Sequence, residues 1–298
     1  MSSAKSALLT LHLGAFLMGA TGLFSKIIEL PAWDITGYRT WIAAIVLFLW
    51  VWWREYHIGL KSLRDFGRMF ILGVLLALHW VTFFYSMQVS SIAIGMISLY
   101  AYPVVTVFME PWLKRTRLDV RDVVSGFLVL VGIYCLVPEF DIDNNTTQGV
   151  LWGVISALTF AVRNLLLGHW FQKQSAARSM SYQVLVVALL MTPVLWLSPH
   201  EPSTHDWWLL LCLGIGFTAI THTLLGFSLR YLKAKTVSLV TCLQPVYAVG
   251  YEIAVLHTYP NTGTLIGGGI IMAAAIYESV REHKTSSKKR QISSRNSN

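Results

Sequence analysis

Long apolar segments alternate with short polar ones along almost the whole chain. A helix that spans a bilayer needs about 20 predominantly apolar residues, and ten segments come close to that length. The uncharged stretch from Met69 to Met109 is too long for a single span, so we divide it at its most polar part, residues 88–91. The pattern predicts an all-α polytopic membrane protein. Its ten transmembrane helices are expected at residues 8–28, 36–53, 68–87, 92–112, 123–138, 149–170, 182–197, 207–229, 236–257 and 262–279.

Composition supports this interpretation. Hydrophobic residues make up 55% of the 298-residue chain and charged residues only 13%, whereas a soluble domain carries about 25% charged residues. The formal net charge of +8 would favour a nucleic-acid partner in a soluble protein, but here we attribute it to cytoplasmic loops and expect no nucleic acid. The three cysteines lie in apolar segments without the spacing of a metal site or a disulfide, and we expect neither metal nor cofactor.

Basic residues predict how the helices are oriented. With the amino terminus in the cytoplasm, all but three of the 23 Lys and Arg lie in cytoplasmic loops or in the carboxy-terminal tail, as the positive-inside rule requires. We therefore expect a multi-pass protein of the bacterial cytoplasmic (inner) membrane with both termini in the cytoplasm. The basic, serine-rich tail is predicted to be disordered and either to anchor the topology or to bind lipid headgroups.

The second half of the chain repeats the first at an offset of 142 residues. The segment SLYAYPVVTVFME corresponds to VTCLQPVYAVGYE, which pairs Pro103 with Pro245 and Glu110 with Glu252. Five predicted helices lie on each side of a polar midpoint, so the two repeats are inverted in the membrane, as in many secondary transporters. The predicted domains are a first repeat at 1–138, a linker at 139–148, a second repeat at 149–280 and the tail at 281–298.

Three motifs carry a resemblance to a known family. They are GATGLFSK at 19–26, leading on to Arg39; ALHWVTFFYSMQVSSIAIGMISLYAYPVVTVFME at 77–110; and FSLRYLKAKTVSLVTCLQPVYAV at 227–249. With them the chain resembles the EamA-type ten-helix branch of the drug/metabolite transporter (DMT) superfamily. The resemblance implies a central cavity between the repeats, alternating access, and proton or exchange coupling. It does not identify a substrate, because the superfamily moves amino acids, vitamins, nucleotide-like compounds and drugs.

Five of the charged side chains within predicted spans are candidates for coupling or gating. Lys26, Arg39 and Arg163 are basic, and Glu110 and Glu252 are acidic. An unpaired charge near the bilayer centre costs several kcal/mol, so we expect these groups to pair. Glu252 could reach Lys26 or Arg39 near the outer side, and Glu110 could reach Arg163 near the inner side. Such pairs would either gate the two ends of the cavity or serve only packing, with Glu110 alternatively reaching the membrane interface.

Two histidines lie near the middle of the third and eighth predicted helices, at nearly equivalent repeat positions. Histidine titrates close to neutral pH, so His79 or His222 could carry a coupling proton. The alternative is an interior histidine that only satisfies hydrogen bonds. The sequence leaves both interpretations open.

Aromatic and amide side chains are the candidate substrate contacts. They are Trp80, Tyr100, Tyr102, Trp152 and Gln244. Aromatic walls suit planar or amphipathic substrates through stacking and cation–π contact, although aromatic residues are abundant throughout this chain and could equally be packing groups.

The two repeat-related prolines should shape the cavity. Because proline removes a helical hydrogen bond, Pro103 and Pro245 are predicted to kink helices 4 and 9. Each kink would expose the carbonyl four residues back, at Leu99 and Thr241, to the cavity or to a neighbouring helix.

These observations favour a secondary transporter of a small organic metabolite, such as an amino acid or a related amphipathic compound. Uptake of an aromatic vitamin such as riboflavin is the alternative within transport. An intramembrane enzyme would need clustered catalytic groups, and the polar residues here are dispersed, so we do not expect an enzyme. The expected partners are the substrate, the lipid bilayer and, with proton coupling, protons; a monomer and a homodimer both stay open.

Overall fold

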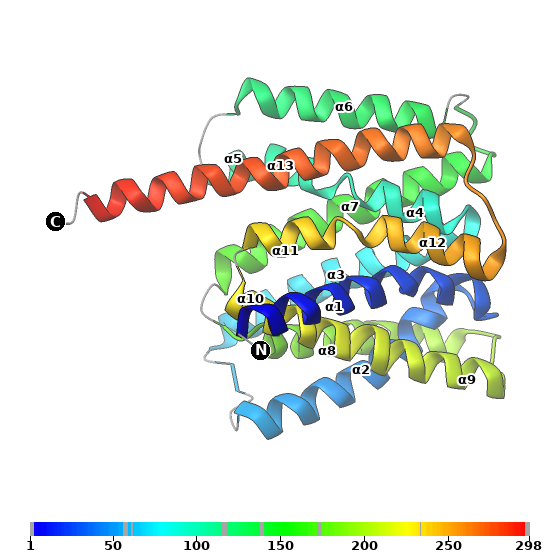
Figure 1. Cartoon of the computed structure of the whole chain (residues 1–298). Helices are drawn as coiled ribbons and strands as arrows, with labels where there is room; N and C mark the ends of the chain where they lie inside the picture. The colour runs from blue at the N-terminus through cyan, green and yellow to red at the C-terminus, as the bar shows by residue number, and fades with distance from the viewer. Residues whose placement is uncertain are drawn as a thin grey trace.

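The computed structural model describes residues 3–55, 59–60, 62–114, 118–137, 140–171, 174–232 and 234–295. Helices are the only regular elements within these ranges (Figure 1). They are α1 (Ser3–Ile27), α2 (Ala32–Glu55), α3 (Leu63–Val89), α4 (Ile92–Leu99), α5 (Tyr102–Lys114), α6 (Val120–Leu136), α7 (Asn145–Trp170), α8 (Ala176–Leu197), α9 (Thr204–Leu211), the π-helix η1 (Cys212–Ile220), α10 (Thr221–Tyr231), α11 (Ala234–Thr241), α12 (Gln244–Leu256) and α13 (Thr262–Arg295).

The elements group into the ten predicted spans. Three spans are composite within the described residues: α4 with α5, α9 with η1 and α10, and α11 with α12. Eight helical segments are long and apolar enough to cross a membrane, and the apolar part of α13, Thr262–Glu278, is shorter. The remaining predicted span corresponds to α6, which has 17 residues and packs along α13 at one edge of the bundle (Figure 1). The prediction of an all-α polytopic membrane protein is confirmed.

Helices from the two halves of the chain are interleaved, so the halves do not form two separate bundles. From the first half, α1 packs along α10 and α12, α2 along α8, and α3 along both α7 and α8. Each of these contacts joins helices from opposite halves, so any space enclosed at the centre is lined by both. The domain boundary predicted at Pro138 and Glu139 lies outside the described residues, and the other predicted boundaries stay predictions.

Both proline sites are helix breaks rather than kinks, which corrects the prediction. α4 ends at Leu99 and α5 begins at Tyr102, while α11 ends at Thr241 and α12 begins at Gln244. All four of these bounds keep the offset of 142 residues. Each proline is the second residue of its new helix, where its missing N–H costs no helical hydrogen bond. The chain therefore stops one helix and starts another at each proline site.

The last helix runs past the predicted start of the carboxy-terminal tail. α13 continues to Arg295, and disorder of residues 281–298 in the protein stays a prediction. The physical reason is local: residues 281–295 contain neither Gly nor Pro, so nothing in them terminates the helix that the preceding apolar span begins.

Candidate functional site

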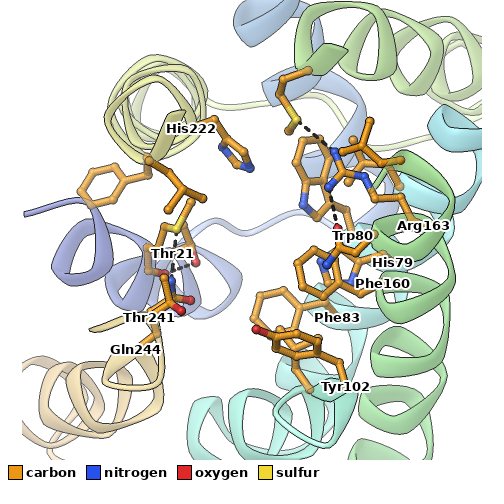
Figure 2. A pocket seen from close by; sticks show the side chains of 18 of the residues that line it. Thr21, His79, Trp80, Phe83, Tyr102, Phe160, Arg163, His222, Thr241 and Gln244 are labelled. Atoms are coloured by element: carbon orange, nitrogen blue, oxygen red, sulfur yellow. Dashed lines mark hydrogen bonds between the residues drawn. The ribbon is translucent and has the colours of Figure 1, made fainter. Parts of the chain in front are cut away.

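A cavity of about 390 Å³ lies between the two halves of the chain, within the range of about 300–1,000 Å³ typical of small-molecule sites. Figure 2 shows two facing walls, with His222, Thr21 and Gln244 on one and Trp80, His79 and Arg163 on the other. The lining also includes Ala176 at the start of α8 and Val237 near the start of α11. The cavity therefore extends toward the end of the bundle where α7 leads to α8 and α10 leads to α11.

Most of the side chains singled out from the sequence meet in this cavity. Those that line it are Arg39, His79, Trp80, Tyr100, Tyr102, Arg163, His222 and Gln244. Trp152 is not among the lining residues: it is 37% exposed and packs edge-on against Tyr85, with ring centroids 5.5 Å apart. The structure therefore places Trp152 outside this cavity. Helical spacing along α7 puts Trp152 on the same face as Arg163, but the described cavity lining on this helix begins only at Phe160.

Arg39 on α2 is enclosed by aromatic rings. The side chain is 2% exposed, and its guanidinium carbon lies 4.4 Å from the ring centroid of Trp80 and 4.3 Å from that of Phe84. Cation–π attraction of this kind is worth about 2 kcal/mol or more where the cation is desolvated. Nε and Nη2 are nevertheless buried without a hydrogen-bond partner among the described residues. The expected pairing of Arg39 with Glu252 does not form.

Arg163 on α7 is held by neutral groups. Its Nε donates to Oε1 of Gln183 at 2.7 Å, and Nη1 donates to Oδ1 of Asn164 at 2.8 Å. Gln183 is itself fixed by its Nε2, which donates to the Ser179 carbonyl at 2.9 Å. Amide oxygens satisfy the donors of an arginine without cancelling its charge, so the cation is positioned and keeps its full field. The pairing with Glu110 predicted from the sequence is replaced by these amides.

His79 on α3 is stacked and hydrogen-bonded. Its ring lies 4.5 Å from that of Phe160 and 5.9 Å from that of Phe83. The Ser156 hydroxyl donates to the His79 carbonyl at 3.0 Å, and Nδ1 of His79 lies 2.7 Å from that same hydroxyl oxygen. Because the hydroxyl proton is already used, Nδ1 must be the donor in the second contact. The geometry is that of an interior histidine whose Nδ1 position is fixed by α7.

His222 follows the π-helix η1, which the sequence analysis did not anticipate. Its Nδ1 donates to the Thr218 carbonyl at 2.8 Å, and its ring meets Trp80 edge-on with centroids 6.2 Å apart. Short π segments often occur at functional sites. Gly214 in η1 lies so close to α2 that a Cβ there would be 3.0 Å from the carbonyl oxygen of Arg39. The two glycines of the sequence LGIG were the available signal for this close approach.

Tyrosines from the first proline break complete the aromatic wall. Tyr102 meets Phe160 edge-on at 4.9 Å between centroids and Tyr100 at 5.7 Å. The Tyr100 hydroxyl donates to the carbonyl of Thr241, four residues before Pro245. This contact confirms the prediction that the proline leaves the Thr241 carbonyl to a neighbouring helix, and it joins the break in one repeat to the break in the other.

Other lining residues were missed from the sequence although two had a signal. Phe84 lies four residues after Trp80 and therefore on the same face of α3. Asn164 adjoins Arg163 as a second polar residue in an apolar helix. Met18, Thr21 and Phe217 also line the cavity, and no local pattern distinguishes them from packing residues.

Lys26 and Glu252 lie beyond the cavity, at the α3–α4 junction (residues 88–91). The ammonium of Lys26 donates to the carbonyls of Gln88 at 3.1 Å and Ser90 at 2.9 Å. The two carboxylate oxygens of Glu252 accept from the backbone N–H groups of Ile92 at 3.0 Å and Ala93 at 2.8 Å. Each charge thus binds the helix end of opposite polarity, and the two charges also attract each other across the junction. The junction is tied to α1 on one side and to α12 on the other.

The cavity offers cations and aromatic rings rather than a metal site. None of the described residues that line it is Asp or Glu. Nor do three His, Cys, Asp or Glu side chains come together anywhere in the described ranges in a way that could hold a metal ion. Chemically, the arrangement can bind a small amphipathic molecule by stacking and by hydrogen bonds from basic groups.

Comparison with known proteins gives the same picture of two repeats. The model of the EamA-like transporter family matches residues 5–137 and again residues 147–278. The "Uncharacterized transporter YxxF" of Bacillus subtilis is 24% identical over 283 residues, covering 93% of this chain and 90% of that protein. The "S-adenosylmethionine uptake transporter" of Rickettsia conorii is 25% identical over 303 residues, covering 97% and 99%. A crystal structure of 16% sequence identity has a TM-score of 0.65 and covers 93% of this chain and 98% of its own, which shows the shared fold.

Proposed function

Because the chain belongs to the EamA-like transporter family, we propose that it moves a small organic metabolite through the central cavity by alternating access. A small-metabolite transporter is what the names of its relatives support. The observation that carries the more specific proposal is the cavity itself. It lies between the two repeats and gathers eight of the polar and aromatic residues that the sequence marks as unusual for a membrane helix.

The α3–α4 junction is proposed as the closed end of the pathway. The cavity lining extends toward the α7–α8 end of the bundle, while Lys26 and Glu252 hold the junction to α1 and α12. In the predicted orientation this junction faces outward and the cavity faces the cytoplasm. Opening the outer end then requires the hydrogen bonds of Lys26 and Glu252 to break. The repeat predicts an equivalent role for Glu110 at the opposite end.

The substrate proposal follows from the wall of the cavity. The rings of His79, Phe160 and Tyr102 offer flat surfaces, which favour a planar or amphipathic metabolite. Amino acids and related compounds lead, and an aromatic vitamin such as riboflavin is the second candidate. Relatives from Rickettsia are S-adenosylmethionine uptake transporters, which makes import the direction to test first.

The driving force is proposed to be a proton gradient or exchange. Glu252 is the leading coupling group, because protonating its carboxylate would remove an acceptor from the Ile92 and Ala93 N–H groups and loosen the junction. His79 and His222 are the alternatives within the cavity. In the bacterial inner membrane, with both termini in the cytoplasm, inward proton flow would then be linked to opening of the outer end.

The experiment is counterflow into proteoliposomes that contain the purified full-length chain. The panel consists of amino acids, nucleosides, S-adenosylmethionine and flavins, each measured with and without a pH gradient. Trp80→Ala, inside the cavity, should abolish exchange, whereas Trp152→Ala, its matched control outside the cavity, should retain it. Exchange that is lost equally in both variants, or lost in neither, would contradict the cavity as the substrate site.

A further inference from the structure

The charges that line the cavity are all of one sign. Arg39 and Arg163 both line it, and none of the described lining residues is acidic. The carboxylate of Glu252 is engaged by Ile92 and Ala93 at the α3–α4 junction, outside the lining. Among the described lining residues, any molecule in the cavity therefore meets two fixed positive charges and no fixed negative one. In the low dielectric of a membrane protein such a field discriminates strongly by ligand charge.

The two arginines differ in how many of their hydrogen-bond donors lack a partner in the part of the chain that the structure describes. Arg163 has its Nε and Nη1 engaged by Gln183 and Asn164. Arg39 is 2% exposed and lines the cavity, and its Nε and Nη2 are buried without a hydrogen-bond partner among the described residues. A buried guanidinium without a partner is costly, and the cost is relieved when an anion binds. The guanidinium group of Arg39 is therefore the candidate binding group for an anionic ligand.

The surroundings of Arg39 suit one kind of anion. Trp80 and Phe84 lie close to its guanidinium carbon, at 4.4 and 4.3 Å. Rings in these positions restrict where the guanidinium can move but offer it no hydrogen-bond acceptor. A guanidinium binds carboxylate or phosphate through two parallel hydrogen bonds, which neutral aromatic neighbours cannot replace. Farther along the same wall, His79 and Phe160 are stacked 4.5 Å apart and offer a surface for a flat apolar group.

From this arrangement we infer that the cavity selects organic anions, whose acidic group binds Arg39 while their planar part lies against the wall formed by His79 and Phe160. The inference rests on the proposed function and specifies its substrate class. It excludes compounds whose charge is mainly positive, because nothing described in the lining would pair with an ammonium or a sulfonium. S-adenosylmethionine, the cargo in the names of the Rickettsia relatives, carries both of these cations and is disfavoured here.

The test compares three probes of the same shape and different charge. Isothermal titration calorimetry with the full-length protein in detergent would use 2-naphthoate, 2-naphthylmethanol and 2-naphthylmethylammonium. The carboxylate should bind about tenfold or more tightly than the alcohol, the scale of one charge-assisted contact, and the ammonium should not bind measurably. Binding of the ammonium as tight as that of the carboxylate, or no binding of the carboxylate, would overturn the inference. This comparison uses the wild-type chain and does not depend on how a variant folds.

Variants then locate the anion. Arg39→Gln should weaken 2-naphthoate binding by about tenfold or more and leave the alcohol unchanged, and Arg39→Lys should keep part of the affinity because it keeps the charge but loses the fork. Arg121→Gln, which removes an exposed arginine outside the cavity, is the matched control and should bind like wild type. Unchanged 2-naphthoate binding in Arg39→Gln would overturn the assignment to Arg39.

The transport arm separates this inference from the proposed function. If proteoliposomes exchange S-adenosylmethionine or 2-naphthylmethylammonium but not 2-naphthoate, the transporter proposal stands and the anion inference fails. If 2-naphthoate binds through Arg39 but no compound of the panel is exchanged, the anion site stands and the transporter proposal fails.

Discussion

Buried charges are treated differently at the α3–α4 junction and in the cavity. At the junction, Lys26 and Glu252 have opposite signs, and each binds two backbone groups at 2.8–3.1 Å. In the cavity, Arg39 and Arg163 have the same sign, and Nε and Nη2 of Arg39 lack a hydrogen-bond partner among the described residues. The junction thus satisfies its charges with the ends of its own helices. In the cavity, we propose that the substrate supplies the missing hydrogen-bond acceptors of Arg39. The junction would then use its buried charges for structure, and the cavity would use its charge to bind a ligand.

The largest effect on stability is expected from Glu252→Ala. The substitution leaves the N–H groups of Ile92 and Ala93 without an acceptor, and two hydrogen bonds to a charged group are worth about 3 kcal/mol. Thermal unfolding in detergent should detect the loss, and a cysteine placed at Ser91 should become more reactive toward a thiol reagent. Glu201→Ala, which removes an exposed acidic residue from the α8–α9 loop, should behave like wild type. Equal stability of the two variants would mean that the junction does not depend on Glu252.

A smaller effect is expected from Lys26→Met, at about 2 kcal/mol for the contacts of one ammonium with two carbonyls. Because Lys26 and Glu252 hydrogen-bond different backbone groups and interact with each other only through their charges, combining Lys26→Met with Glu252→Gln should be additive to within about 1 kcal/mol. A direct buried ion pair would instead make the double variant clearly milder than the sum of the single ones. Unfolding measurements on the four members of this cycle decide between the two cases.

A third prediction concerns a neutral group between the two sites. Tyr100→Phe removes the hydroxyl that donates to the Thr241 carbonyl and should cost about 1 kcal/mol. In a Pro245→Ala background the restored N–H of residue 245 can bond that same carbonyl, so the cost should disappear. Pro245→Ala by itself should express normally but turn over more slowly, because it stiffens the break between α11 and α12. Tyr259→Phe, at a residue that is 73% exposed, is the control, and a persistent cost in the Pro245→Ala background would contradict the shared carbonyl.

The smallest change is expected from the histidines of the cavity. His79→Gln and His222→Gln should retain the pH dependence of net transport, since both rings are held by hydrogen bonds within the protein. Glu252→Gln should impair flux driven by a pH gradient while keeping some counterflow at equal pH, because exchange does not require release of the proton. Loss of pH dependence in a histidine variant would move coupling from the junction into the cavity.

Local rules were sufficient for much of the fold. The spacing of apolar segments predicted all ten spans, and the polar residues 88–91 predicted the junction between α3 and α4, because hydrocarbon thickness sets the length of a helix irrespective of its neighbours. The repeat predicted that both prolines interrupt the chain at equivalent places. It did not predict a complete break, since whether a proline kinks or ends a helix depends on what receives the freed carbonyl, and here the receiver is Tyr100.

The sequence could not predict which groups on distant helices form hydrogen bonds with each other. The contact between Glu252 and the N–H of Ile92 joins positions 160 residues apart, and nothing in either segment identifies the other. Sequence reasoning paired charges with charges, whereas helix ends offered closer partners of the right polarity. The position of Trp152 relative to the cavity was likewise undecidable. Helical spacing places this residue on the same face of α7 as Arg163, and only the packing shows that the described lining on α7 begins at Phe160.

By itself, the sequence determined the class of protein, the number of spans, the inverted repeat and the side chains that are too polar for a lipid-facing helix. These follow from the energetics of moving each residue into hydrocarbon, a property of residue type and local order. Only the tertiary structure decided which charges have hydrogen-bond partners within the protein and which keep buried donors without one in the described ranges. That distinction between Glu252 and Arg39 depends on how α1, α2, α4 and α12 are placed relative to one another, because a hydrogen bond or a stacking contact requires a particular distance and direction between groups far apart in the chain.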